Sequence, residues 1–202
     1  MKVLENFKSA REFLGQDFIR PEQIEEVTGL LYGNEQLGKL ATTFPSLQKL
    51  KYCADNSIML IPGPPKSMSL SNLFKLKPRR FQKEDILEYS KEKFANNEKA
   101  DMGWIALRKA PISASVGRRF LEQVNLLYEP EYVPNAVTIA WCVVMRLELN
   151  IKGFPHTAYV RTLSTLRGKV IHIGRGFPRT EIASLPGEKC GGAIGLNSAI
   201  RL

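Results

Sequence analysis

The chain has 202 residues, of which 44% are apolar and 24% are charged, and its formal net charge at pH 7 is +9. This composition is typical of a globular protein that is large enough to bury a core, and it excludes a small scaffold that depends on disulfides. The three cysteines, Cys53, Cys142 and Cys190, are odd in number and widely spaced, which favours a reducing, cytoplasmic setting.

The N-terminal part of the chain, residues 1–61, is expected to be helical. Apolar residues recur at helical spacing in residues 7–14, Pro21 can occupy the first turn of a second helix, and Asn34 can cap a third. The cluster Pro62-Gly63-Pro64-Pro65 then interrupts the pattern, because proline fixes the backbone and removes hydrogen-bond donors. We place residues 62–202 in an α+β core that forms one compact unit with the N-terminal helices.

The core combines one long apolar segment with several strands. Residues 134–150 are apolar nearly all round and are too long for an ordinary strand, so we expect a buried helix. Residues 103–109 are expected to form a strand, residues 157–163 and 169–175 a hairpin, and two short strands should follow near 180–184 and 192–200. The sequence therefore predicts an α+β fold in which an antiparallel sheet packs on the apolar helix and the N-terminal helices form a cap.

A membrane anchor and a secretory signal are not expected. The longest apolar run extends from Ala136 to Met145 and is interrupted by Thr138, whereas a bilayer-spanning helix needs about 20 apolar residues. The N-terminal residues lack the apolar stretch and cleavage site of a secretory signal. We therefore expect a cytoplasmic protein without a membrane partner.

Four motifs along the chain point to a known group of proteins. They are Pro62-Gly63-Pro64-Pro65 followed by Met68-Ser69-Leu70, the run Gly103-Trp104-Ile105-Ala106-Leu107-Arg108-Lys109, the pair Val133-Pro134, and Tyr159-Val160-Arg161-Thr162. From about Phe18 to the C-terminus the chain resembles a family of uncharacterised bacterial hypothetical proteins. In that family the segment after the Arg-Thr pair is usually acidic and Ser-rich, whereas here it is Leu163-Ser164-Thr165-Leu166-Arg167. The resemblance implies a bacterial, cytoplasmic protein and no particular activity.

The positive charge is concentrated toward the C-terminus. Residues 1–67 hold eight Lys and Arg against eight Asp and Glu, whereas residues 134–202 hold nine against three. A localised basic surface raises the local concentration of anionic partners. Candidate ligand-binding residues are therefore expected in this part of the chain.

The predicted C-terminal hairpin suggests a ligand-binding patch. Strand side chains alternate between faces, so pairing the apolar sets of the two strands places Arg161 opposite His172 and Tyr159 opposite Gly174. A two-residue turn at Leu166-Arg167 would give this register. The resulting face carries the candidate ligand-binding residues, which are Tyr159, Arg161 and His172, with Arg175 and Arg179 just beyond them.

Two interpretations of this face are open. An arginine fork matches phosphate or carboxylate, and a neighbouring aromatic ring can stack on a base, which favours anion recognition. The alternative is a solvated or helix-covered sheet face in which Arg161 pairs with Glu148 or Glu181, because polar cross-strand pairs are common in sheets.

A second basic segment is a candidate for nucleic-acid binding. Its cations are Lys75, Lys77, Arg79 and Arg80. Closely spaced cations can contact a phosphate backbone with salt-dependent affinity. The alternative is a solvated loop whose charge is balanced by Glu84, Asp85 and Glu88 of the helix that follows.

Catalysis is less strongly indicated by the sequence. Cys190 lies in a glycine-rich segment next to Lys189, which can lower the pKa of the thiol, and His172 or His156 would have to act as the base. A glycine-rich turn between two strands explains the same residues without chemistry. The histidines and cysteines show none of the close spacings of structural metal sites, so we expect neither a metal nor a cofactor.

The leading functional interpretation is a non-enzymatic module that binds an anionic partner, nucleic acid or a nucleotide, through a basic C-terminal sheet. One alternative is a hydrolase-type or transferase-type enzyme that uses Arg161, His172 and Cys190. Another is a structural or interaction protein that forms a homodimer.

Overall fold

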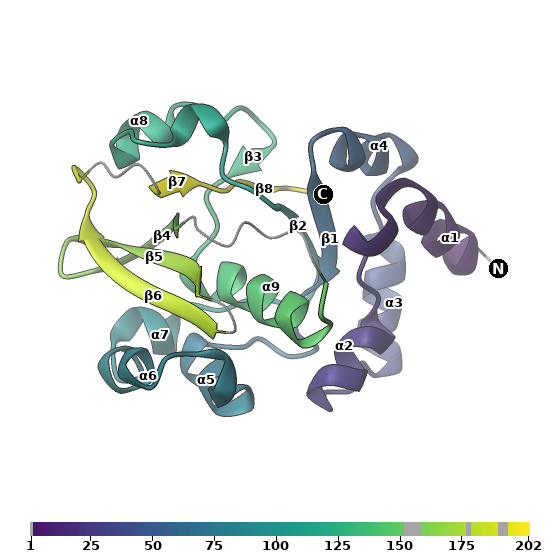
Figure 1. Ribbon diagram of the computed structural model, residues 1–202. Helices are drawn as coiled ribbons and strands as arrows, with labels where there is room; N and C mark the ends of the chain where they lie inside the picture. Colours follow the sequence, from purple (N-terminus) through teal and green to yellow (C-terminus); the bar gives the residue numbers. More distant parts are fainter. Residues whose placement is uncertain (1, 152–158, 177–178, 190–193) are drawn as a thin grey trace.

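A computed structural model describes residues 2–151, 159–176, 179–189 and 194–202 (Figure 1). Its α-helices are α1 (Lys2–Leu14), α2 (Pro21–Thr28), α3 (Asn34–Thr42), α4 (Leu47–Asp55), α5 (Leu70–Leu76), α6 (Lys83–Tyr89), α7 (Lys93–Asn97), α8 (Phe120–Val124) and α9 (Ala136–Glu148). Its strands are β1 (Ile58–Pro62), β2 (Trp104–Arg108), β3 (Glu131–Tyr132), β4 (Tyr159–Leu166), β5 (Lys169–Gly176), β6 (Arg179–Pro186), β7 (Ile194–Leu196) and β8 (Ala199–Ile200). Short 3₁₀ helices are η1 (Gly15–Asp17), η2 (Pro78–Arg80) and η3 (Ser113–Ser115).

The described strands form two sheets of four strands each. The first has the order β1-β2-β8-β3, and the second has the order β6-β5-β4-β7. All pairings are antiparallel except the one between β4 and β7, which is parallel. The predicted α+β class is confirmed, but the strands that were expected in one sheet are divided between two.

The division occurs near the C-terminus. Residues 192–200 were predicted as one strand, whereas β7 joins the second sheet and β8 joins the first. The two residues between β7 and β8, Asn197 and Ser198, are both buried. The side-chain amide of Asn197 donates a hydrogen bond to the backbone carbonyl of Arg108 at 2.9 Å. This contact with β2 helps to fix the point at which the chain leaves one sheet for the other.

Helix α9 lies between the two sheets (Figure 1). Asn135 caps it by accepting a hydrogen bond from the backbone N–H of Thr138 at 2.9 Å, as expected for a side chain that satisfies an otherwise unpaired donor. Residues of α9 share one hydrophobic cluster with β1 and β2 on one side and with β4 and β5 on the other. Because apolar surface surrounds it, the helix is apolar nearly all round, and the predicted buried helix is confirmed.

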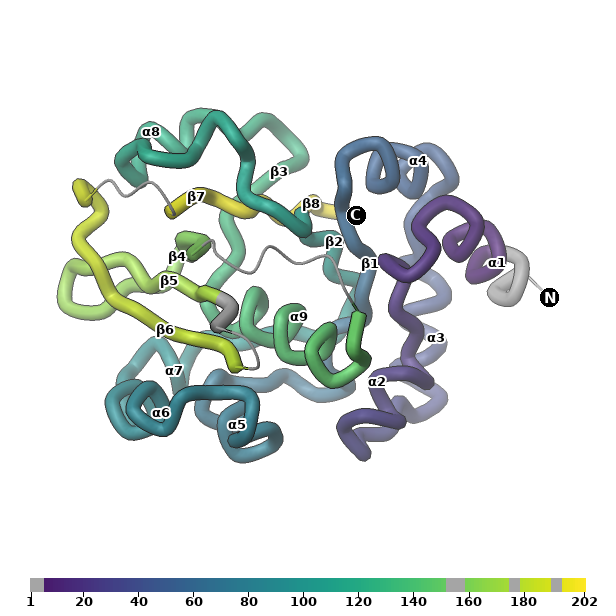
Figure 2. Tube along the Cα trace, in the orientation of Figure 1, coloured from purple at the N-terminus to yellow at the C-terminus, as the bar shows by residue number. Residues whose placement is uncertain are grey.

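Helices α1 and α4 pack on the other face of the first sheet (Figure 2), whereas the buried residues of α2 and α3 belong to the cluster that contains α9. Phe7, Phe18 and Phe44 surround Trp104 of β2 with ring centroids 5.1–5.9 Å from the indole, distances at which aromatic rings attract one another.

The predicted boundary between residues 61 and 62 falls inside β1, which pairs along its whole length with β2. Among the described residues, no helix has the length and apolar character that crossing a bilayer would require.

A buried ion-pair network also joins the N-terminal helices to α9. Asp17 of η1 accepts from the Arg146 guanidinium at 2.9 Å and from the Lys109 ammonium at 2.5 Å. Arg146 is only 2% exposed. Since a buried charge is costly unless it is paired, this network explains how α9 accommodates an arginine in an otherwise apolar environment.

Candidate functional site

The hairpin of β4 and β5 has the predicted register next to Arg161, but a different turn. Arg161 lies opposite His172, as expected. The turn consists of Arg167 and Gly168, both with positive φ, of 50° and 77°, which is one residue later than predicted. Positive φ at both positions is typical of the hairpin turn that matches strand twist. A β-bulge between Arg161 and Thr165 compensates for the later turn and restores the expected pairing.

Tyr159 and Gly174 are also neighbours, as predicted. A Cβ atom at Gly174 would lie 2.6 Å from two carbons of the Tyr159 ring, so the ring occupies the space of the missing side chain. The Tyr159 hydroxyl donates a hydrogen bond to Glu181 of β6. Burial, together with this carboxylate, raises the pKa of Tyr159 to about 12. The phenol is therefore engaged within the sheet.

Of the two interpretations of the face around Arg161 and His172, the structure supports a covered face and contradicts an open ligand-binding face, because both side chains are fully buried. The Arg161 guanidinium donates to the carbonyl of Arg118 at 2.9 Å, to the Gln123 side chain at 3.0 Å and to the carbonyl of Lys189. Its Nε atom also donates to Nε2 of His172 at 3.2 Å. The segments that provide these partners cover the sheet face, so Arg161 holds the fold together instead of facing a ligand.

His172 is held as a neutral imidazole. Its Nδ1 atom lies 2.9 Å from the carbonyl of Val170, to which it donates, because Nε2 accepts from Arg161. Burial, and to a lesser degree the Arg161 charge, lowers the pKa of His172 to about 4. A general base must reach the proton that it removes, and both ring nitrogens of His172 are engaged. His156 and Cys190, the other members of the expected catalytic group, lie outside the described residues.

The second candidate segment, residues 75–80, lies beside the start of β6. A parallel bridge joins Phe81 to Thr180. The Arg179 guanidinium donates to the side chain of Gln82 at 3.1 Å. Arg179 was predicted to belong with the hairpin patch, but the structure brings it to the other candidate segment. We call the combined cations the basic surface; its members are Lys75, Lys77, Arg79, Arg80 and Arg179.

A groove of about 530 Å³ lies within the basic surface. Its lining residues are Leu76, Lys77, Pro78, Arg79, Arg80 and Glu148. Glu148, at the end of α9, accepts hydrogen bonds from Lys77 at 2.6 Å and from Arg80. Burial alone would raise the pKa of the Glu148 carboxyl, but the hydrogen bonds from these two cations lower it below its usual value. One carboxylate thus faces three cations in the groove.

The remaining cations of the basic surface face solvent. Lys75, Arg79 and Arg179 are exposed, and within the described parts of the chain none of them forms an ion pair. Of the three acidic residues that were expected to balance this segment, Asp85 has a different partner. Asp85 points instead to β6, where it accepts from the backbone N–H of Ile182 at 2.8 Å. The basic surface therefore keeps a net positive charge.

Sequence reasoning missed Glu148 as the central partner of Lys77 and Arg80, although it considered Glu148 as a partner of Arg161. The available signal was that Glu148 is one of only three acidic residues after residue 133. The side chain of Arg175 lies outside what the structure describes, although its backbone pairs with Thr180 in the hairpin of β5 and β6.

Comparisons of the chain with protein-family models, with curated proteins and with solved structures found no match.

Proposed function

We propose that this protein is a non-enzymatic module that binds the phosphate backbone of a nucleic acid through the basic surface. The observation that carries the proposal is the bridge between Phe81 and Thr180. It joins the basic segment 75–80 to Arg179, so that cations from two distant parts of the sequence form one surface.

The composition of this surface suits a polyanion. Lys75, Arg79 and Arg179 are exposed and make no ion pair with the rest of the described chain. Arginine and lysine that neutralise phosphates release counterions from the nucleic acid, and this release supplies much of the affinity. A nucleotide offers the same phosphate chemistry on a smaller scale, and it would occupy the groove next to Glu148.

The test is fluorescence anisotropy of labelled single-stranded and duplex oligonucleotides at several salt concentrations. The double variant Lys75→Ala and Arg79→Ala removes two exposed cations from the basic surface. A matched control, Lys49→Ala and Lys51→Ala, removes two exposed cations from α4. We expect the first variant to bind more weakly and to reduce the slope of log affinity against log salt by about 2, whereas the control retains its affinity.

Two results would contradict the proposal. One is an absence of binding by the unmodified protein at low salt, and the other is an equal loss of affinity in both double variants. If mononucleotides bind in the groove and displace the oligonucleotide, the smaller ligand is the better candidate. The homodimer alternative remains a prediction.

A further inference from the structure

The groove of the basic surface already holds an anionic group of the protein itself. One oxygen of the Glu148 carboxylate accepts a hydrogen bond from Lys77 at 2.6 Å, and the other accepts from Arg80. Lys77 also donates to the backbone carbonyl of Val27. A phosphate group that entered the groove would approach this carboxylate, and like charges repel each other. We therefore expect the phosphates of a ligand at the three exposed cations of the basic surface and not at the carboxylate.

The exposed cations are attached to well-packed parts of the fold. Lys75 lies in the last turn of α5, whose apolar residues belong to the core. Arg79 lies in η2, and the bridge just after η2 joins the chain to β6 at the residue that follows Arg179. Gln82 accepts a hydrogen bond from the Arg179 side chain at 3.1 Å. The backbone positions of these cations relative to one another are therefore set before a ligand binds.

Cations at preset positions favour a ligand whose phosphates are also held in a fixed arrangement. Binding costs free energy for every group that loses conformational freedom, and two rigid partners keep this cost low. A nucleic-acid duplex is stiff over many base pairs, whereas a flexible single strand has to be ordered when it binds. The basic surface is therefore better suited to a duplex than to a single strand.

The aromatic rings of the basic segment face the core. Proteins that bind single strands commonly stack the bases on aromatic side chains. Phe74 and Phe81 flank the basic segment, but they are only 2% and 1% exposed, and they pack edge-to-face with ring centroids 4.7 Å apart. Figure 1 shows α5 and α6 at the bottom of the view, away from α1, α4 and α8. The exposed aromatic side chains of the described chain lie on α1, on α4 and after α8, and they are Phe13, Tyr52 and Tyr128.

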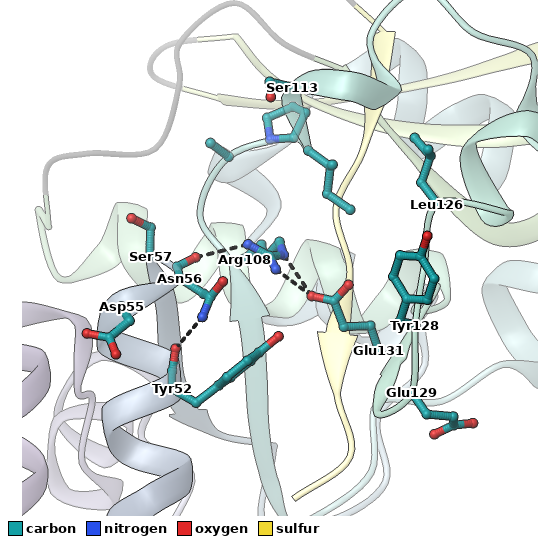
Figure 3. Close-up of a pocket in the computed structure, with 13 residues that line it drawn as sticks. Tyr52, Asp55, Asn56, Ser57, Arg108, Ser113, Leu126, Tyr128, Glu129 and Glu131 are labelled. Carbon is teal, nitrogen blue, oxygen red and sulfur yellow. Dashed lines mark hydrogen bonds and ion pairs between the residues drawn. The ribbon is translucent and has the colours of Figure 1, made fainter.

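A second cavity, of about 580 Å³, lies beside Arg108 and Glu131 and is unsuited to phosphate (Figure 3). Nε and Nη2 of Arg108 donate to Oε1 of Glu131 at 2.9 and 2.6 Å, and Nη1 donates to the carbonyl of Asn56 at 3.1 Å. Arg108 is the single cation among the lining residues, against the carboxylates of Asp55, Glu129 and Glu131. This part of the surface repels a polyanion, so we assign the phosphate contacts to the basic surface.

Resting on the function proposed above, we propose that the partner of the basic surface is a double-stranded nucleic acid that is contacted through its phosphates. Lys75, Arg79 and Arg179 bind phosphates of the duplex, while Glu148 keeps phosphate out of the groove. The bases stay paired and stacked on one another, so they require no aromatic ring from the protein. A mononucleotide, which would have to bind next to Glu148, is disfavoured by the same carboxylate.

The test is fluorescence anisotropy at one near-physiological salt concentration with four labelled probes. They are a DNA duplex, the RNA duplex of the same sequence, a thymine-only single strand with as many phosphates as the duplex, and the same single strand without bases. We expect the DNA or the RNA duplex to bind at least about tenfold more tightly than the thymine strand. The abasic strand should bind as weakly as the thymine strand, because no ring stacks on the bases. ATP at millimolar concentration should not displace the duplex.

Variants show where the duplex binds. The double variant Lys75→Ala and Arg79→Ala should weaken duplex binding, whereas the matched control, Lys49→Ala and Lys51→Ala on α4, should not. Phe177→Ala changes an aromatic residue that is close to Arg179 in sequence. It should leave the affinities for the duplex and for the single strand unchanged.

The outcomes separate this proposal from the one on which it rests. If the thymine strand binds as tightly as both duplexes and loses affinity in the double variant of the basic surface, nucleic-acid binding stands but the preference for a duplex is overturned. A lower affinity of the abasic strand than of the thymine strand, a loss of affinity in Phe177→Ala, or displacement of the duplex by ATP would also overturn the preference. Absence of binding by all four probes would overturn both proposals.

Discussion

Nε of Arg161 donates to Nε2 of His172 across the β4–β5 hairpin at 3.2 Å, and both side chains are fully buried. This arrangement requires a neutral imidazole, because a protonated ring would present a donor to a donor beside a fixed positive charge. Stability should therefore depend on the protonation state of His172.

The pKa of His172 is lowered to about 4 in the folded protein from its ordinary value of 6.5. Between these values the unfolded chain binds a proton that the folded protein does not, so the His172 contribution to stability is lost as the pH falls from about 6.5 to about 4. The loss should amount to about 2–3 kcal/mol. His172→Gln can still accept from Arg161 but does not titrate. In urea unfolding at pH 7 and pH 5, the unmodified protein should lose more stability than this variant; equal losses would contradict the prediction.

Asp85 should affect the pH dependence of stability in the opposite direction from His172. Its burial, despite the hydrogen bond from Ile182, raises the pKa of the carboxyl to about 6 from 3.8. The folded protein then binds more protons than the unfolded chain in this range, so the Asp85 contribution is present below about pH 4 and is lost as the pH rises through about 6. Asp85→Asn, whose amide oxygen can still accept from Ile182, should stabilise the protein at pH 7 by about 1 kcal/mol. Urea unfolding at pH 7 and pH 4.5 would show this gain only at the higher pH. A variant that is less stable than the unmodified protein at pH 7 would exclude the explanation.

Arg161 links the sheet to the segments that cover it, so Arg161→Lys should destabilise the protein. A lysine cannot reach the carbonyls of Arg118 and Lys189 together with Gln123, and unpaired buried groups are costly. We expect a loss of about 3 kcal/mol in the free energy of unfolding. The matched control is Arg167→Lys in the hairpin turn, where the side chain is 83% exposed; its effect should stay within about 0.5 kcal/mol. Similar melting temperatures for the two variants would refute the role assigned to Arg161.

Gly174→Ala should destabilise the protein because the new methyl group would lie 2.6 Å from carbons of the Tyr159 ring. Overpacking of this kind costs about 1–3 kcal/mol. Gly38→Ala is the matched control, because a Cβ atom there meets nothing within 4 Å and alanine favours the helix by about 0.5–1 kcal/mol. The midpoint temperature of thermal unfolding should thus fall for Gly174→Ala and rise for Gly38→Ala. In a Tyr159→Ala background, Gly174→Ala should cost much less than in the unmodified protein. An equal cost in both backgrounds would argue against the contact as the cause.

Glu148→Gln should strengthen nucleic-acid binding, because it releases Lys77 and Arg80 from the carboxylate that faces them. Affinity in the anisotropy assay should rise several-fold and should depend more steeply on salt. Glu92→Gln, which breaks the ion pair of Glu92 with Arg167 on another part of the surface, adds the same net charge and serves as the control. If both variants bind equally, net charge and not the groove governs the affinity.

Several features of the fold were predictable because they depend on residues that are close in sequence. The apolar pattern of residues 134–150, with Asn135 before it, was sufficient to predict α9. Strand alternation together with the predicted turn placed Arg161 opposite His172 and Tyr159 opposite Gly174, and the bulge restores this pairing although the turn lies one residue later. The predicted turn was one residue too early because no local sequence pattern indicates the bulge after Arg161. In the bulge, the backbone N–H of Leu163 donates to the carbonyl of Pro134 instead of to the neighbouring strand.

By itself the sequence determined the buried helix α9, the β4–β5 hairpin and which side chains share a strand face in it, since these depend on periodicity and capping within a few residues. Only the tertiary structure decided which faces are covered. It buried Arg161 and His172 under distant segments, placed Arg179 beside residues 75–80, and formed the cavity around Glu131 from parts of the chain that are far apart in sequence. Such contacts arise from the packing of whole elements against one another, and no local pattern of residues encodes them.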